Sequence, residues 1–187
     1  MPNWNKTYAE KIIDDATPAD VLVENKQRLS PQGVALDFAS GLAGNGIYLA
    51  RKGYHVSAWD LSQVAVEKIN AYAAENELTL NAQVHDLENN LPKIKNKFDV
   101  VVVSYFLHRE SLRYLYDILK KGGVLFYQTF SGEPFQQQGP QRSEFRLKSN
   151  ELLTVFSDMQ LLFYQEDDRC SASANAKPGQ TCFVAKK

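Results

Sequence analysis

Cysteine is scarce in this sequence of 187 residues, which contains only Cys170 and Cys182. Two cysteines are too few for a disulfide framework and lack zinc-ligand spacing, so we expect structural thiols, no metal site and a reduced, cytoplasmic protein. Long apolar runs are also missing, because the most apolar stretch, FDVVVVSYFL, has the length of a buried strand. The first fifteen residues, MPNWNKTYAEKIIDD, lack the apolar core of a signal peptide.

The sequence has no excess of charge of either sign, since 21 basic side chains stand against 22 acidic ones and the net charge is −1. This balance argues against nucleic acids and acidic membrane surfaces as partners. The 44% hydrophobic and 11% aromatic residues are typical of a globular protein. The length suits a single domain, 1–187, which we expect to be a monomer or a small homo-oligomer.

Predicted strands and helices alternate along residues 31–131. Strands are predicted at VALDF (34–38), YHVSAW (54–59), TLNAQVHD (79–86), KFDVVVVSYF (97–106) and GVLFYQTF (123–130). A helix is predicted up to about Lys52 with Gly53 as its left-handed cap, and a second one begins after the capping residue Ser62. A third helix, 111–121, has a stripe of Leu112, Leu115, Tyr116 and Leu119 and ends at Gly122-Gly123. This alternation predicts a parallel sheet with helices on both faces.

The two ends of the chain follow other patterns. Residues 6–29 are predicted to be helical in two pieces that divide near Pro18. After Ser131 a polar loop leads to a helix around 150–158. The segments LLFYQED (161–167) and TCFVAK (181–186) then suit an antiparallel hairpin, because a turn rich in Ala, Ser, Pro and Gly separates them.

Small residues follow the first predicted strand in the segment ALDFASGLAGNG (35–46). A strand that turns abruptly into a helix needs small residues where its backbone approaches a ligand closely. The helix amino terminus offers free N–H groups that favour a carboxylate or phosphate. A tight connection that binds no ligand is the alternative.

Three acids favour a ligand. Asp37, Asp60 and Asp86 fall at the carboxyl ends of the first, second and third predicted strands, and therefore along one edge of the sheet. Ligands of open α/β sheets bind outside that edge. A carboxylate at the end of the second strand can accept hydrogen bonds from both hydroxyls of a ribose. The pattern therefore indicates a cofactor that contains a nucleoside.

The identity of that cofactor has two candidates. Gly41, Ala43 and Gly46 fit the pattern G-x-G-x-x-G with an alanine in the middle, which would make the protein an NAD-dependent oxidoreductase. Asp37 argues against a dinucleotide because it would repel a pyrophosphate at the turn. A cofactor that carries an ammonium and a sulfonium tolerates this acid better.

Five segments resemble the class I S-adenosylmethionine-dependent methyltransferases, and within them the small tellurite-resistance-like group. They are LDFASGLAGNGIYLARKGYHVSAWDLS, HDL, FDVVVVSYFLHR, LKKGGVLFYQTF and FRLKSNELLTVFSDMQLLFYQED. The resemblance implies an α/β fold, a Rossmann-like three-layer sandwich whose seven-stranded, mostly parallel sheet has the order 3-2-1-4-5-7-6 and an antiparallel last strand. It also implies a helical amino-terminal lid (1–30), a cofactor-binding half (31–131), and a substrate loop, helix and terminal hairpin (132–187).

The resemblance assigns the cofactor, S-adenosyl-L-methionine, to named residues. The methionine part would lie over Ala39 and Gly41, and Asp60 would bind the ribose hydroxyls. The remaining cofactor residues that it implies are Asp37 and Asn45 near the turn, Leu61 and Leu87 against the adenine, Asp86 at its amino group, and Ser104 on the methionine side. The sequence departs from the family at Ala39 and Ala43, where glycine is usual, and at Gly44, where a basic residue is common.

Candidates for chemistry follow the fourth predicted strand. Tyr105 and His108 would face the transferred methyl group, which makes them the candidate catalytic residues. In the alternative reading, His108 caps or begins the next helix and Arg109 is solvated. Trp4 and Tyr8 would either close over the cofactor, as the resemblance suggests, or pack within an amphipathic helix.

The loop after the fifth strand carries Arg142, Arg146 and Lys148, which would either attract an anionic substrate or simply be solvated. The terminal hairpin contains Arg169 with Asp167 and Asp168, and this composition makes tellurite a poor candidate substrate. We therefore expect methyl transfer to a small molecule by direct displacement at the sulfonium methyl. The alternatives are an NAD-dependent oxidoreductase and a non-catalytic cofactor-binding domain on the same fold.

Overall fold

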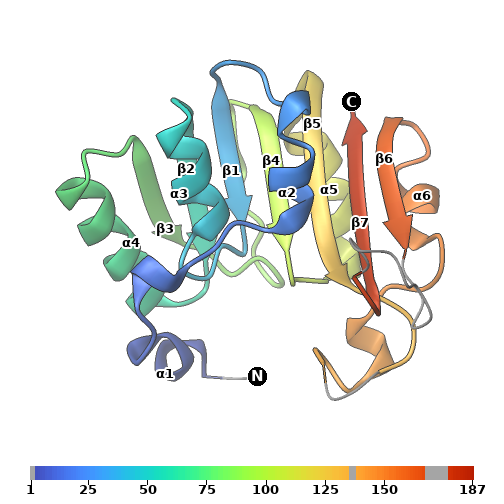
Figure 1. Cartoon of the computed structure of the whole chain (residues 1–187), viewed down its shortest axis with the longest axis horizontal. Coiled ribbons are helices and arrows are strands. Elements are labelled where there is room, and N and C mark those ends of the chain that lie inside the picture. Colours follow the sequence, from blue (N-terminus) through green and yellow to red (C-terminus); the bar gives the residue numbers. More distant parts are fainter. Residues whose placement is uncertain (1–2, 135–137, 167–176) are drawn as a thin grey trace.

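The computed structural model describes residues 3–134, 138–166 and 177–187. A seven-stranded sheet in the order β3-β2-β1-β4-β5-β7-β6 forms its centre (Figure 1). The strands are β1 (Val34–Phe38), β2 (His55–Asp60), β3 (Leu80–Val84), β4 (Phe98–Ser104), β5 (Leu119–Phe130), β6 (Gln160–Glu166) and β7 (Gln180–Lys186). Only β7 runs antiparallel to its neighbours in this sheet, so the predicted fold class, strand order and terminal hairpin are confirmed.

Helices cover both faces of the sheet. They are α1 (Trp4–Ala9), α2 (Asp20–Glu24), α3 (Gly44–Arg51), α4 (Gln63–Glu75), α5 (Leu112–Ile118) and α6 (Glu151–Val155). Figure 1 shows α2, α3 and α4 on one face and α5 on the other. Two apolar clusters match this layering: one joins α2, α3 and α4 to the sheet, and the other joins α5 and α6 to it.

The run of four valines in β4 shows how the sequence builds these layers. Val100 and Val102 belong to one cluster, whereas Val101 and Val103 belong to the other, and all four are buried. Successive side chains of a strand point to opposite faces, so a strand covered on both sides needs apolar residues at every position. The prediction of a strand with both faces buried is confirmed.

The third helix is shorter than predicted. Helix α5 ends at Ile118, and β5 begins at Leu119, which pairs with Phe98 of β4. Gly122 lies inside β5 with φ +82°, and its N–H donates to the carbonyl of Lys187 at the end of the chain (2.8 Å). Pairing with segments distant in sequence therefore overrides the local helical pattern of residues 119–121.

The amino-terminal helices are also shorter than predicted. Residues 6–29 form only short pieces, α1 and α2 with turns of 3₁₀-helix at Ile13–Asp15 and Lys26–Arg28. Helix α6 is likewise limited to Glu151–Val155 within the predicted 150–158.

Four residues named in the sequence analysis lie outside the described residues: Asp167, Asp168, Arg169 and Cys170. No described helix combines the length and apolar content that crossing a membrane requires.

Candidate functional site

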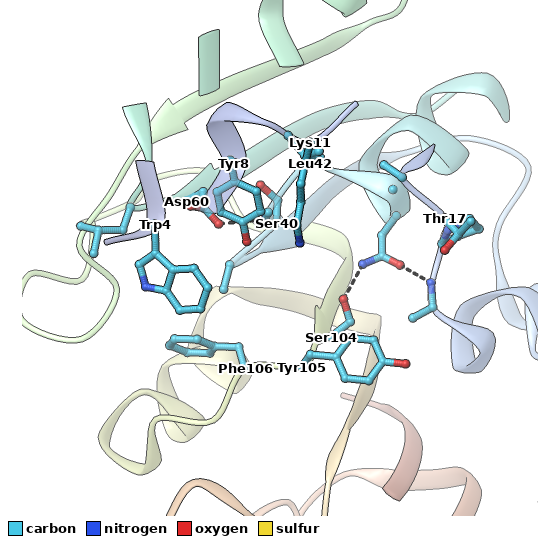
Figure 2. Close-up of a pocket in the computed structure, with 18 of the residues that line it drawn as sticks. Trp4, Tyr8, Lys11, Thr17, Ser40, Leu42, Asp60, Ser104, Tyr105 and Phe106 are labelled. Atoms are coloured by element: carbon cyan, nitrogen blue, oxygen red, sulfur yellow. Dashed lines mark hydrogen bonds between the residues drawn. The ribbon is translucent and has the colours of Figure 1, made fainter. Parts of the chain in front are cut away.

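A cavity of about 930 Å³ opens at the carboxyl ends of the central parallel strands. Its walls come from α1 and the segment after it, the turn between β1 and α3, and the residues that follow β2, β3 and β4 (Figure 2). Eight of the predicted cofactor residues line it, namely Ala39, Gly41, Asn45, Asp60, Leu61, Asp86, Leu87 and Ser104. Asp37 does not line it, because its side chain is fully buried beneath the turn.

The turn between β1 and α3 uses the left-handed conformation three times. Ala39, Gly41 and Ala43 have φ values of 57°, 56° and 56°. Each alanine in this region costs about 1–2 kcal/mol relative to an ordinary conformation. A Cβ at Gly41 would lie 2.9 Å from the Tyr8 hydroxyl, so glycine there also permits the close approach of α1.

Asp60 closes the turn from the neighbouring strand. One carboxylate oxygen accepts a hydrogen bond from the Gly41 N–H (2.8 Å), and the other accepts from the Ser62 N–H (2.9 Å). Burial raises the pKa of Asp60. Each oxygen can accept a second hydrogen bond, and the side chain lines the cavity, so it remains able to bind hydroxyl donors.

Asp37 and Asn45 form a buried polar link under the same turn. Asp37 accepts hydrogen bonds from the Asn45 side-chain amide (3.1 Å) and the Gly46 N–H (2.8 Å), and burial raises its pKa to about 7. The same amide donates to Ser104 Oγ (3.0 Å), while Asn45 Oδ1 accepts from the Ala19 N–H (2.8 Å). Asn45 therefore joins β1, β4 and the amino-terminal segment at one point.

Gly44, a departure from the resembling family, has a structural explanation. A Cβ at this position would lie 2.2 Å from the carbonyl oxygen of Thr17. The amino-terminal segment therefore crosses the start of α3 too closely for any side chain at Gly44.

Apolar and polar residues follow the carboxyl ends of β2 and β3 side by side. Leu61, directly after β2, is 42% exposed and lines the cavity, as does the buried Leu87. Asp86 lies at the surface, where its carboxylate accepts hydrogen bonds from the Asn89 side chain and backbone, and these bonds lower its pKa.

Tyr105 is the first residue after β4, and two features single it out. It adopts a left-handed backbone (φ 55°), which is uncommon for a residue other than glycine, and it is 53% exposed in the cavity wall. Such outliers persist only where surrounding contacts hold them, and they cluster at functional sites. Burial of its hydroxyl raises the pKa of Tyr105, so it is a neutral phenol at neutral pH.

Gln128 holds Tyr105 in place. This fully buried residue of β5 accepts from the Tyr105 N–H through its carbonyl (2.8 Å), and its side-chain amide donates to the Tyr105 hydroxyl oxygen (3.3 Å). The amide also donates to Gln180 Oε1 (2.9 Å) and accepts from the Val21 N–H (2.9 Å). We did not predict this role, although a glutamine inside an otherwise apolar buried strand was a readable signal.

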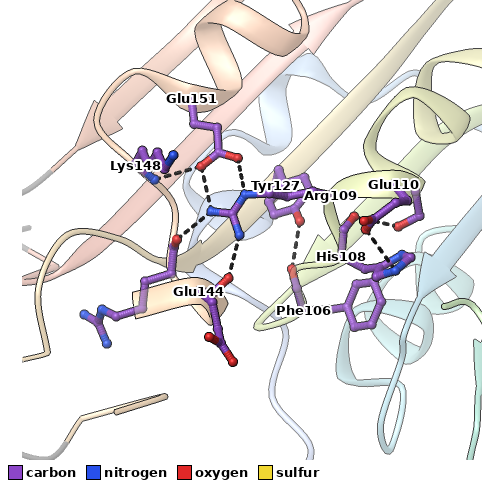
Figure 3. Close-up of polar contacts among 10 residues, drawn as sticks. Phe106, His108, Arg109, Glu110, Tyr127, Glu144, Lys148 and Glu151 are labelled. Atoms are coloured by element: carbon purple, nitrogen blue, oxygen red, sulfur yellow. Dashed lines mark hydrogen bonds and ion pairs between the residues drawn. The ribbon is translucent and has the colours of Figure 1, made fainter. Parts of the chain in front are cut away.

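His108 does not line the cavity. Its Nε2 lies 3.1 Å from Glu110 Oε2, and its buried Nδ1 has no hydrogen-bond partner among the described residues. The neighbouring Arg109 is not simply solvated, because it pairs with Glu151 (2.7 Å) and donates to the carbonyls of Glu144 and Arg146 (Figure 3). Arg109 thus fixes the loop after β5 against the turn after β4.

Arg146 is a structural residue, so its predicted alternatives, a solvated side chain and an anion-binding one, are both wrong. It is 2% exposed, and its guanidinium donates to the carbonyls of Ser131 (3.0 Å), Gly132 (2.8 Å) and Gly179 (3.1 Å). Arg142 and Lys148 remain exposed.

The amino-terminal segment forms one wall of the cavity through Trp4 and Tyr8, whose rings stack with centroids 6.0 Å apart. It is tied to α4 at two places. Asn5 Oδ1 accepts from Ser62 Oγ (2.8 Å), and Lys68 Nζ donates to the carbonyls of Tyr8 and Ala9 (2.8 Å each).

The cavity wall also contains a buried polar group that is left without a partner. Ser40 lies in the cavity wall, and its buried hydroxyl has no hydrogen-bond partner among the described residues. A bound ligand would supply that partner, because buried polar groups are rarely left unsatisfied. The described residues contain no group of three acidic, histidine or cysteine side chains placed to hold a metal ion.

Comparison with known proteins finds similarity to methyltransferases. Residues 35–123 match a protein family described as a methyltransferase domain. The chain is 27% identical over 168 residues to the probable S-adenosyl-L-methionine-dependent methyltransferase TehB of Haemophilus influenzae. The aligned region covers 86% of this chain and 57% of the relative. The chain therefore spans little more than half the length of this relative.

Solved structures show the same fold. TehB from Haemophilus influenzae superposes with a TM-score of 0.75 at 21% identity, covering 98% of this chain and 67% of that chain. Coclaurine N-methyltransferase, bound to N-methylheliamine and SAH, superposes with a TM-score of 0.63 at 16% identity, covering 78% of this chain and 49% of that chain.

Proposed function

We propose that this chain, whose residues 35–123 match a methyltransferase domain and which is similar to TehB, transfers a methyl group from S-adenosylmethionine to a small-molecule acceptor. The observation that carries the proposal is the arrangement of Asp60 and the left-handed turn around one cavity. Asp60 fixes the backbone of Gly41 and keeps acceptor capacity for ribose hydroxyls.

In this proposal different residues of the cavity bind different parts of the cofactor. Ala39, Gly41 and Asn45 hold the methionine part with Ser104, while Leu61 and Leu87 provide the apolar surface for the adenine next to Asp86. Asp37 acts from below by holding the Gly46 N–H and Asn45. Trp4 and Tyr8 cover the site from the amino-terminal segment and exclude water from it.

The bound cofactor supplies an electrophilic methyl group, which an acceptor lone pair takes in a direct displacement. The protein then contributes mainly by positioning the two reactants, an effect that supplies roughly 7–11 kcal/mol in favourable cases. In this proposal Tyr105, a neutral phenol whose oxygen accepts from Gln128, keeps its proton and donates a hydrogen bond that orients the acceptor molecule. We assign His108 no role in this scheme, since its ring contacts Glu110 and does not line the cavity.

Calorimetric titration with S-adenosylhomocysteine tests the proposal. Asp60→Asn should weaken binding at least tenfold, because a charged hydrogen bond is worth roughly 1.5–3 kcal/mol. Asp158→Asn is the matched control, since Asp158 pairs with the surface residue Arg113 and does not line the cavity. Failure of the wild-type protein to bind at millimolar ligand would overturn the proposal.

Further measurements distinguish the proposed function from two alternatives. The spacing of Gly41, Ala43 and Gly46 favours an NAD-dependent oxidoreductase, which predicts a larger thermal shift with NAD(H) than with S-adenosylmethionine. A non-catalytic binding domain predicts cofactor binding without turnover. Release of S-adenosylhomocysteine with any member of a panel of small acceptors would exclude it.

A further inference from the structure

The cavity contains a single side chain that is cationic at neutral pH among its described lining residues, and it is Lys11. His85 also lines the cavity, but burial lowers its pKa, so it is neutral under these conditions. The Lys11 ammonium lies 5.4 Å from the centre of the Tyr8 ring. Figure 2 shows the side chain extending past Leu42 toward the open space between Tyr8 and Ser104.

Lys11 does not lie on a free chain end, because Lys68 fixes the backbone around it. The Lys68 ammonium donates to the carbonyls of Tyr8 (2.8 Å), Ala9 (2.8 Å) and Lys11 (2.7 Å). An ammonium has three protons, so these contacts use all of its donors. Lys68, which belongs to α4, therefore sets the direction in which Lys11 leaves the main chain after α1.

Every other charged group that lines the cavity at neutral pH is a carboxylate. These carboxylates are Glu10, Asp15, Asp20, Asp60, Asp86 and Glu88. A cofactor that carries an ammonium and a sulfonium suits such a wall, and its only anionic group is the α-carboxylate of its methionine part. Within the described lining, Lys11 is the one group with the charge to pair with that carboxylate.

We infer that Lys11 binds the α-carboxylate of the cofactor and that Lys68 positions it by clamping the three carbonyls of the amino-terminal segment. This inference rests on the proposed function. It assigns to the amino-terminal segment a direct contact with the cofactor, in addition to the cover provided by Trp4 and Tyr8. In this arrangement Lys11, which lies outside the glycine-containing turn, favours a cofactor whose methionine part keeps its carboxylate.

The test pairs a change in the protein with a change in the ligand. Calorimetry measures the affinity of wild type and Lys11→Met for S-adenosylmethionine and for its decarboxylated analogue, which lacks only the carboxylate. Lys11→Met should weaken binding of S-adenosylmethionine about tenfold, the effect of losing one charged hydrogen bond in a partly exposed site. Binding of the decarboxylated analogue should change less than about twofold. Lys11→Arg should retain most of the affinity.

Two further variants complete the design. Lys6→Met is the matched control, since Lys6 is an exposed lysine of α1 that does not line the cavity, and it should leave both affinities unchanged. Lys68→Met should weaken S-adenosylmethionine more than the decarboxylated analogue. An equal loss for both ligands in Lys11→Met, or no loss for either, would overturn the role of Lys11. If Lys68→Met binds S-adenosylmethionine with the affinity of wild type, the positioning role of Lys68 is wrong. Absence of binding by the wild-type protein would instead refute the proposed function.

Discussion

Replacing Ala39 by glycine is expected to stabilise this protein, although the same change destabilises most helices and strands. Ala39 has φ 57°, a conformation that costs an alanine about 1–2 kcal/mol but a glycine almost nothing. Glycine loses about 0.4–1 kcal/mol through the greater freedom of its unfolded chain. Because Ala39 is only partly buried, the difference leaves a net gain of about 0.5 kcal/mol.

Three other alanines calibrate this value. Ala43 has the same conformation (φ 56°) but a fully buried methyl group, whose loss of about 0.8 kcal/mol brings the expected change close to zero. Ala71 and Ala73 lie in α4, where glycine should cost about 1 kcal/mol at the exposed Ala71. At the buried Ala73 the two losses add to about 2 kcal/mol.

Urea unfolding followed by circular dichroism measures all four variants under one set of conditions. The expected order of stability is Ala39→Gly, Ala43→Gly, Ala71→Gly and Ala73→Gly, with similar urea dependence throughout. Calorimetry with S-adenosylhomocysteine should show no loss of affinity in Ala39→Gly, which removes a methyl group from the cavity wall. If Ala39→Gly destabilises the protein as much as Ala71→Gly does, the attribution of strain to the turn is wrong.

Two more predictions concern the buried polar groups. Because burial raises the pKa of Asp37 from 3.8 to about 7, the folded state holds this proton more tightly than the unfolded chain, and the free energy of unfolding should fall as pH rises between these values. Asp37→Asn should flatten that dependence in urea unfolding, and an unchanged slope would contradict the assignment. Gln128→Leu leaves the Val21 N–H unpaired and should cost about 1–3 kcal/mol of stability. It should also lower kcat for the acceptor more than cofactor affinity, because it releases Tyr105, and equal effects would argue against that role.

Several local features were predictable because they depend on nearby residues or on simple periodicity. Ser62 caps α4 as expected, with its hydroxyl accepting from the Ala65 N–H (3.2 Å), and Gly53 adopts the predicted left-handed conformation (φ 89°). The strand-end acids Asp60 and Asp86 lie at the predicted edge of the sheet. Each prediction needed only the residue type, its neighbours and the alternation of strands with helices.

Other features depended on partners that local patterns do not reveal. Arg146 looked like a loop cation but is buried, because carbonyls at Ser131 and Gly179 converge on its guanidinium. The amino-terminal segment forms shorter helices than predicted, and the N–H groups of Ala19 and Val21 at the start of α2 bond to side chains of α3 and β5. These contacts join residues up to 107 positions apart, so no periodicity in the sequence records them.

The sequence by itself determined the α/β alternation, the small-residue turn, the acids at the strand ends and the resemblance to a methyltransferase, because all of these are written in residue type and spacing. Only the tertiary structure decided which groups reach the cavity. Asp37 is buried below the turn, and His108 does not line the cavity. Lys11 and Tyr105 do line it, and they are held there by hydrogen bonds from Lys68 and Gln128. The physical reason is that a side chain's direction is set by hydrogen bonds between distant segments, and these form only when the sheet and its helices have packed.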